Sequence, residues 1–257
     1  MSELQQNIEL IKKVNTLLLK RFRPTGTDTL KMKKDEEIVT QADLDANKLI
    51  TKFLLKNYPN DDIISEEATK IDNPGKETWY IDPLDGTTNF AYGYREFATC
   101  LAQISEKGEV LQGIIGLPAY KEIFWAKKGG KAYLNGVKIH VSKNGKHRKR
   151  DLFLFCGGHS DEGQKKFSNI MRNIDPSTIR FRSLASAGIE FSSVACGRAD
   201  GCALVEVHPW DVLAGVIIVR SAGGKVTNFA GKEWTLNDKT IAASNGFAHN
   251  KLLKLIK

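Results

Sequence analysis

The sequence predicts an α/β protein with an α+β N-terminal half, residues 1–148, and an α/β C-terminal half, residues 149–257. Two amphipathic helical stretches open the chain, and short apolar runs divided by Gly, Pro and Asn follow them. Beyond the middle of the chain, strand and helix patterns alternate. With 257 residues, 41% hydrophobic and 26% charged, the composition is that of a globular protein and excludes disordered, collagen-like and coiled-coil classes.

Two helices are expected before any strand. The first covers 4–22, where apolar residues recur at helical spacing: Ile8, Ile11, Val14 and Leu18. Residues 23–38 are polar and irregular. Asp43 is a candidate cap for the second helix, which ends at Tyr58-Pro59. Its expected buried face consists of Ala46, Ile50, Phe53 and Leu54.

Short β-type runs come next and predict a largely antiparallel sheet. These runs cover residues 63–64, 79–81, 97–104, 110–116, 122–126 and 138–141. Asn135-Gly136 is typical of a two-residue hairpin turn, because both residues tolerate a positive φ. Hairpins join antiparallel neighbours, which supports the expected sheet.

Strands and helices then alternate to the end of the chain. Strands are expected at 152–156, 179–182, 201–207, 225–227 and 240–243. Helices are expected at 164–173, 187–196, 212–222 and 248–256. The boundary between the halves is placed in a basic loop near residue 148.

The net charge of +8 raises the question of a nucleic-acid partner. Its densest basic run, Lys143–Arg150, has no interleaved aromatic residue and lies between apolar segments, which is typical of a solvated loop. Nucleic-acid binding is therefore not favoured, although a basic surface would steer a small anionic substrate.

Cysteine usage and apolar stretches predict a cytoplasmic, unprocessed protein. The four cysteines are scattered and form no C-x-x-C pair, so neither a disulfide framework nor a zinc site is indicated. The sequence has no apolar stretch near the roughly 20 residues that a membrane span needs, and its start lacks the apolar core of a secretory signal.

Acidic residues gather at three places near the ends of predicted elements. Glu66-Glu67 follows an apolar pair, Asp82 and Asp85 follow the run at 79–81, and Trp210-Asp211 opens an apolar helix. Asp-Pro and Asp-Gly pairs often only turn the chain. Two carboxylates joined through a stiff proline, with the Leu84 carbonyl between them, also offer the hard oxygen ligands that Mg²⁺ prefers.

The residues after Asp85 favour an anion site. Gly86 allows backbone amides to approach an anion closely, and Thr87-Thr88 would open a helix, whose free N–H groups stabilise a phosphate. Metal ligands beside such a site point to phosphoryl chemistry. Asp211 is either an N-cap of its helix or a further metal ligand, and one carboxylate can serve both purposes.

Together these segments resemble the inositol monophosphatase family of Mg²⁺-dependent, lithium-sensitive phosphatases. The resemblance rests first on DPLDGTTNF at 82–90, the Glu pair at 66–67 and WDVLAG at 210–215. IVTQAD at 38–43, the segment 113–139 ending its hairpin in Asn-Gly, and RSLASAGIEFSSVACGRADG at 182–201 extend it over almost the whole chain. The resemblance implies a layered αβαβα sandwich of the sugar-phosphatase type, a homodimer, two or three Mg²⁺ ions and Li⁺ as an inhibitor.

The resemblance also implies roles for individual residues. The metal ligands would be Glu66, Asp82, the Leu84 carbonyl, Asp85 and Asp211. Thr87 and Glu66 would position and activate the attacking water, with Asp43 at the edge of the site as a third catalytic residue. Substrate contacts would come from Asp85, Gly86, Thr87, Ser186, Ala187, Glu206 and Asp211.

The substrate is expected to be a small phosphorylated polyol or sugar, with inositol 1-phosphate first. Family members that act on inositol phosphate usually carry a substrate-contacting Glu where this chain has Leu204, and Glu206 is the nearest carboxylate. Fructose 1,6-bisphosphate therefore stays an alternative. Adenosine 3′,5′-bisphosphate is less favoured, because Thr88-Asn89 replaces the Lys and acidic residue typical of that branch. A nucleic-acid-associated protein on the phosphatase fold is the alternative from a different functional class.

Overall fold

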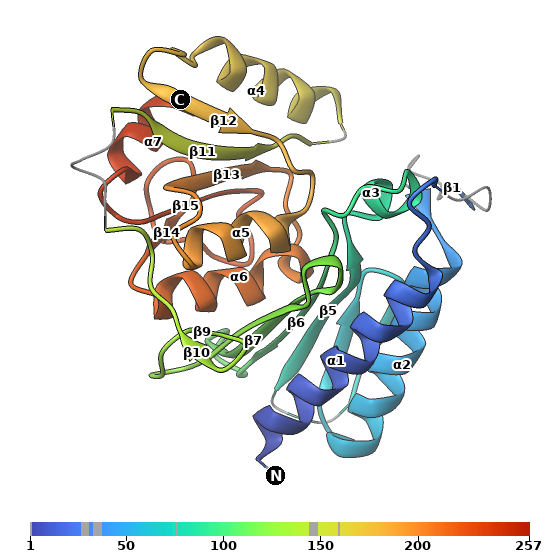
Figure 1. Cartoon of the computed structure of the whole chain (residues 1–257). Coiled ribbons are helices and arrows are strands. Elements are labelled where there is room, and N and C mark those ends of the chain that lie inside the picture. The colour runs from blue at the N-terminus through green and yellow to red at the C-terminus, as the bar shows by residue number, and fades with distance from the viewer. Residues whose placement is uncertain are drawn as a thin grey trace.

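The computed structural model describes residues 2–26, 31–32, 38–73, 75, 77–143, 149–158 and 160–257. Its helices and sheets form five layers in the order α, β, α, β, α (Figure 1). This arrangement confirms the expected α/β class and the layered sandwich.

Helices α1 (Glu3–Arg21) and α2 (Gln41–Asn57) form the first layer. The apolar stripe of α1 is buried as expected. Two short strands, β1 (Lys31–Met32) and β2 (Ile38–Val39), pair before α2, so the expectation of two helices before any strand is wrong. The predicted cap of α2 is also wrong by three positions, because Thr40 is the N-cap and Asp43 completes a capping box with it.

An eight-stranded sheet forms the second layer, in the order β10-β9-β8-β7-β6-β5-β3-β4. Its strands are β3 (Asp62–Ser65), β4 (Ala68–Ile71), β5 (Thr78–Asp85), β6 (Ala98–Ile104), β7 (Val110–Leu117), β8 (Glu122–Lys127), β9 (Tyr133–Leu134) and β10 (Val137–Lys138). Every pairing is antiparallel except β3 with β5, which confirms the predicted character of the sheet.

The predicted hairpin turn at Asn135-Gly136 joins β9 to β10, with φ values of 48° and 82°. Both values are positive, as a type I′ turn requires. The strand expected at 138–141 is wrong in extent, since only Val137–Lys138 pairs. Strands β4 and β9 were not expected, because neither has an alternating apolar pattern long enough to identify it.

The second half of the chain supplies the middle helices, a five-stranded sheet and the outer helices. The sheet has the order β12-β11-β13-β15-β14 and consists of β11 (Asp151–Cys156), β12 (Ile179–Arg182), β13 (Gly201–Val205), β14 (Lys225–Thr227) and β15 (Thr240–Ser244). The helices are α4 (Asp161–Arg172), α5 (Ala187–Ala195), α6 (Pro209–Ser221) and α7 (His249–Leu255). Each predicted element is present; β12 and β14 have the predicted bounds, and the ends of the others are shifted. The boundary predicted near 148 lies outside the described residues and stays a prediction.

Three apolar clusters hold the layers together. One joins α1 and α2 to the eight-stranded sheet, a second places α5 and α6 between the two sheets, and a third packs the five-stranded sheet against α7. Burial of these clusters supplies the main favourable term for folding. Within the described residues, no helix is long and apolar enough to cross a membrane.

Glycines of β7 let helices approach both faces of the eight-stranded sheet. A Cβ on Gly116 would lie 2.6 Å from Ile11 Cγ2 of α1, and a Cβ on Gly113 would lie 2.8 Å from Ala214 Cα of α6. Successive residues of a strand face opposite sides, so these two glycines serve the two faces. The close approach of α6 brings its first turn, which carries Asp211, toward the end of β5.

Candidate active site

The site is centred on the end of β5. The pairing of β5 with β6 is irregular between Asp82 and Asp85. The Leu84 N–H donates to Asp82 Oδ1 over 3.1 Å. Gly86 then turns the chain with a φ of 80° into the short helix α3 (Thr87–Ala91), and a Cβ on Gly86 would lie 2.8 Å from the Glu96 carbonyl oxygen. Glycine is therefore needed here both for its φ and for space.

Asp82 is buried and surrounded by other carboxylates. Burial raises its pKa well above the ordinary value for aspartate. Four neighbouring negative charges raise this pKa further: Glu66, Asp85, Asp211 and Asp43. We call these five residues the acidic cluster. Residues from three separate chain segments and from β5 thus gather around one buried carboxylate.

The pKa of the Cys100 thiol on β6 also indicates that three of these charges lie close together. Burial raises the pKa of its thiol well above the ordinary value, and the charges of Asp85, Asp82 and Asp211 raise it further. Asp211 is therefore close to the end of β5 although it lies far along the chain. It is the third residue of α6 rather than its N-cap, and its Oδ2 accepts from the His208 N–H over 2.7 Å.

Asp43 of α2 and Thr87 of α3 form one side of the site. The Thr87 hydroxyl oxygen lies 2.9 Å from Asp43 Oδ1 and 2.8 Å from the Leu84 carbonyl oxygen. Both of these neighbours accept hydrogen bonds, so the single Thr87 proton is donated to one or the other of them. Burial raises the pKa of Asp43, while hydrogen bonds from Thr40 and Thr87 act in the opposite direction.

Asp85 is held by the first turn of α5. Ser186 Oγ donates to Asp85 Oδ2 over 2.5 Å, the Ala187 N–H donates to Oδ1 over 3.0 Å, and the Gly188 N–H donates to Oδ2 over 2.7 Å. Burial raises the pKa of Asp85, and these three hydrogen bonds oppose that rise. Asp85 is thus oriented by a segment of the second half of the chain, although it belongs to the first.

Of two further predicted site residues, Glu66 belongs to the acidic cluster, whereas Glu206 binds a residue of another helix. Glu66 lies in the turn after β3, and its N–H donates to the carbonyl oxygen of Ile81, the residue before Asp82, over 3.1 Å. Glu206 follows β13 with a φ of 59°, and its carboxylate accepts from the backbone N–H (3.0 Å) and the hydroxyl of Ser160 at the start of α4. The structure therefore places Glu206 at the N-terminus of α4.

Three residues outside the predicted set support the site. Thr40 caps α2 and donates from its backbone N–H to Asp43 Oδ2 over 2.8 Å; the T-x-x-D spacing is a sequence signal for this capping box. Asn89 Nδ2 donates to the Glu96 (2.6 Å) and Leu184 (2.7 Å) carbonyl oxygens and so ties α3 to the chain before α5. Glu190 lies fully buried on α5, and no sequence motif around it predicted this burial.

The donor set of the acidic cluster fits a hard divalent cation. A buried carboxylate with four carboxylate neighbours is stabilised when a cation neutralises it, and Mg²⁺ prefers carboxylate, carbonyl and water oxygens. No three His, Cys, Asp or Glu side chains within the described part of the chain stand ready in metal-binding geometry. A cation bound among these carboxylates would offset their mutual repulsion.

Comparison with known proteins decides the family. The inositol monophosphatase family matches the chain over residues 1–257. The chain belongs to this family of phosphatases. It is 34% identical over 257 residues to a protein of Thermotoga maritima named fructose-1,6-bisphosphatase/inositol-1-monophosphatase, covering 100% of this chain and 96% of the relative.

Two further relatives of this family member carry a different name. The Escherichia coli protein named Nus factor SuhB is 30% identical over 242 residues, covering 93% of this chain and 89% of the relative. The crystal structure of the extragenic suppressor protein suhB from Bartonella henselae superposes with a TM-score of 0.91 at 29% identity, covering 100% of this chain and 99% of that one.

Proposed function

We propose that this member of the inositol monophosphatase family is a Mg²⁺-dependent phosphomonoesterase whose acidic cluster holds the metal. One observation supports the proposal above all: the buried Asp82 lies within electrostatic reach of four other carboxylates. Glu66, Asp82, Asp85, Asp211 and the Leu84 carbonyl are the ligands that we assign. When bound, Mg²⁺ would polarise the phosphate and lower the pKa of the attacking water.

Thr87 positions that water in our proposal. Its proton is directed to Asp43 or to the Leu84 carbonyl. A third polar partner can then only donate to the Thr87 oxygen, and a water molecule held in this way turns its own lone pair toward the phosphate. Glu66 is the carboxylate that we assign to accept a proton from this water.

The phosphate would lie at the start of α3. The first N–H groups of a helix have no partner within the helix, and we assign those of Gly86 and Thr87 to the phosphate oxygens. Ser186 and Ala187 orient Asp85, which we place beside the substrate alcohol together with Asp211. Each group is held before the substrate arrives, which lowers the cost of ordering the site.

Inositol 1-phosphate is the first substrate that we propose, with fructose 1,6-bisphosphate as the alternative. The name of the Thermotoga maritima relative includes both activities. Leu204 is buried at the position where a substrate-contacting Glu is expected, and Glu206 binds Ser160 at the start of α4. A role for Glu206 in substrate binding therefore requires that it exchange Ser160 for a substrate hydroxyl. Adenosine 3′,5′-bisphosphate stays a third candidate.

A nucleic-acid-associated role is a second candidate function. The name of the Escherichia coli relative, Nus factor SuhB, and the net charge of +8 favour it. Most of the basic run at 143–150 lies outside the described residues, and only its ends at 143 and 149–150 are described. A steep salt dependence of RNA binding would support this role.

We further propose two or three Mg²⁺ ions, inhibition by Li⁺, a homodimer and a cytoplasmic protein. The number of carboxylates in the acidic cluster supports more than one divalent ion, because one ion neutralises only part of their charge. All four cysteines are free, as expected of a protein from a reducing compartment.

Phosphate release from four substrates tests the proposal: inositol 1-phosphate, fructose 1,6-bisphosphate, adenosine 3′,5′-bisphosphate and β-glycerophosphate, each with Mg²⁺, with chelator and with added Li⁺. We expect chelator-sensitive turnover that is fastest with inositol 1-phosphate. Faster turnover of another substrate would reassign the substrate but retain the metal site. No turnover of any substrate would refute the enzymatic proposal and favour the nucleic-acid role.

A further inference from the structure

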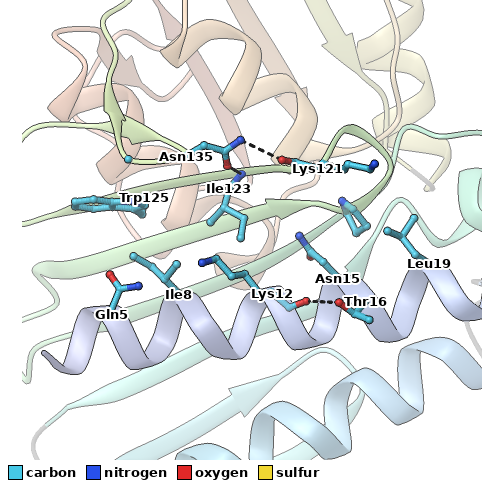
Figure 2. A pocket seen from close by; sticks show the side chains of 12 residues that line it. Gln5, Ile8, Lys12, Asn15, Thr16, Leu19, Lys121, Ile123, Trp125 and Asn135 are labelled. Carbon is cyan, nitrogen blue, oxygen red and sulfur yellow. Dashed lines mark hydrogen bonds between the residues drawn. The ribbon is translucent and has the colours of Figure 1, made fainter. Parts of the chain in front are cut away.

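A cavity with a volume of about 570 Å³ lies between α1 and one edge region of the sheet, formed by the segment after β7, by β8 and by the β9–β10 turn (Figure 2). One wall is a single face of α1 with Ile8, Lys12 and Asn15, and the other includes Lys121, Ile123 and Trp125. None of the described residues that line it belongs to the acidic cluster. The volume falls within the range typical of small-molecule sites, roughly 300–1,000 Å³.

The charge of this cavity is positive. Lys12 and Lys121 are exposed at its rim, and the described lining residues include no Asp or Glu. Lys12 also pairs with Glu9 over 2.7 Å. Lys121 forms no ion pair with any described residue. The two ammonium groups at the opening, of which Lys12 is shared with Glu9 and Lys121 is not, attract an anion.

The inner part of the cavity is apolar. Ile8 and Ile123 are buried on opposite walls. Trp125 is half-buried, and its ring stacks on Tyr133 with ring centres 4.1 Å apart and an interplanar angle of 15°. An aromatic side chain held rigidly in this way offers a flat surface at low entropic cost.

Asn15 adds a polar atom to the cavity that forms no hydrogen bond with the described residues. This residue is only 7% exposed, and its Oδ1 has no hydrogen-bond partner among the described residues. Figure 2 shows its side chain extending from α1 toward the sheet. A Cβ on Gly116 would lie 2.5 Å from this oxygen, so the glycine provides its space. A buried polar atom without a partner is costly, and a bound donor would remove that cost.

We propose that this cavity is a binding site for a small organic anion with a flat apolar body and a hydrogen-bond donor. The anionic group would be held by Lys12 and Lys121, the apolar body would lie against Ile123 and Trp125, and the donor would reach the Asn15 amide. The site is separate from the proposed phosphatase centre and does not depend on it.

The fluorescent probe 1-anilinonaphthalene-8-sulfonate (ANS) tests this proposal, because it combines a sulfonate, an apolar ring system and an N–H donor. We expect the full-length protein to bind one ANS molecule with enhanced emission. The double variant Lys12→Gln, Lys121→Asn should weaken binding by roughly tenfold or more, since each lost charge contact in water corresponds to about fivefold. Asparagine suits the positive φ of 56° at position 121.

Lys13→Gln is the matched control, because Lys13 is an exposed lysine on the same helix that does not line the cavity. It should change ANS affinity by less than about twofold. Equal affinity of the wild type and the double variant, equal weakening by Lys13→Gln, or absence of ANS binding would overturn the proposal. A crystal structure of the ANS complex with density elsewhere would do the same.

Asn15→Leu separates a ligand-binding role from a structural one. Because the Asn15 oxygen has no partner, an apolar side chain of similar size should leave the melting temperature unchanged or raise it, while ANS binding weakens by at least threefold. A lower melting temperature with ANS affinity retained would show that Asn15 serves packing alone. Phosphatase activity measured beside these variants should not change.

Discussion

Glu190 gives the protein a stability that depends on pH. Its side chain on α5 is fully buried; Oε1 accepts from the Leu184 N–H over 3.3 Å, whereas Oε2 has no partner among the described residues. Burial raises the pKa of Glu190 from 4.5 to about 8. The folded protein therefore retains a proton on this carboxyl at neutral pH, and the unfolded chain does not.

The sign and size of the effect follow from this difference in proton binding. Between pH 4.5 and about 8 the folded state binds more protons than the unfolded state, so stability falls as the pH rises. At about 1.4 kcal/mol per pH unit the whole window corresponds to roughly 4–5 kcal/mol. Glu190→Gln replaces the neutral acid by a neutral amide of similar shape and should remove this loss.

Urea unfolding at pH 5 and pH 8 in the presence of EDTA measures the effect. EDTA prevents metal binding at the acidic cluster from adding its own pH dependence. We expect the two proteins to be similarly stable at pH 5 and Glu190→Gln to be more stable by about 3–4 kcal/mol at pH 8.

Glu109→Gln is the control for this comparison. Glu109 is exposed, and its hydrogen bond with Lys128 lowers its pKa, so its replacement cannot remove a decline toward alkaline pH. The same pH dependence in wild type and Glu190→Gln would refute the reasoning, because it would mean that Glu190 ionises in the folded protein as it does in the unfolded chain.

Three other perturbations have expected outcomes. Asp82→Asn should lower phosphate release at least a hundredfold and abolish the Mg²⁺-dependent rise in melting temperature, and retained turnover would contradict the proposed site. The control Asp72→Asn, at an exposed aspartate, should change neither quantity. Gly188→Ala should destabilise the protein by about 1–3 kcal/mol and reduce activity, because the Cβ of the new alanine would lie 2.7 Å from Ala98 Cβ and 3.0 Å from Asp85 Oδ2. Calorimetry measures the first effect and phosphate release the second; wild-type values of both would show that α5 moves aside freely. Burial lowers the pKa of His249 to about 4, so stability should fall by at most about 3 kcal/mol as the pH falls from 6.5 toward 4. In urea titrations, His249→Gln should reduce this loss of stability at acid pH; an unchanged loss would assign it to other groups.

Local patterns determined much of the fold from the sequence alone. The stripe of α1 is buried, the turn at Asn135-Gly136 has the positive φ values that these residues favour, and every strand and helix predicted after residue 150 is present. Periodicity and turn chemistry act over a few residues, so they are readable without knowledge of the partner elements. Element ends were less certain, as the shifted starts of α2 and α6 show.

The composition of the candidate site was also predictable, because its residues lie in short motifs at the ends of elements. The motifs named Asp82, Asp85 and Asp211 as members of one centre, and the structure brings these three carboxylates within electrostatic reach of one another.

Only the tertiary structure decided where other side chains point and what they contact. Glu206 binds Ser160 at the start of α4, Glu190 loses all contact with solvent, and Asn15 retains an unpartnered oxygen beside a cavity. Each of these outcomes depends on residues distant in the sequence that packing brings together. A local pattern reports which face of an element is apolar, whereas the direction and pKa of a single carboxyl depend on which other faces pack against it.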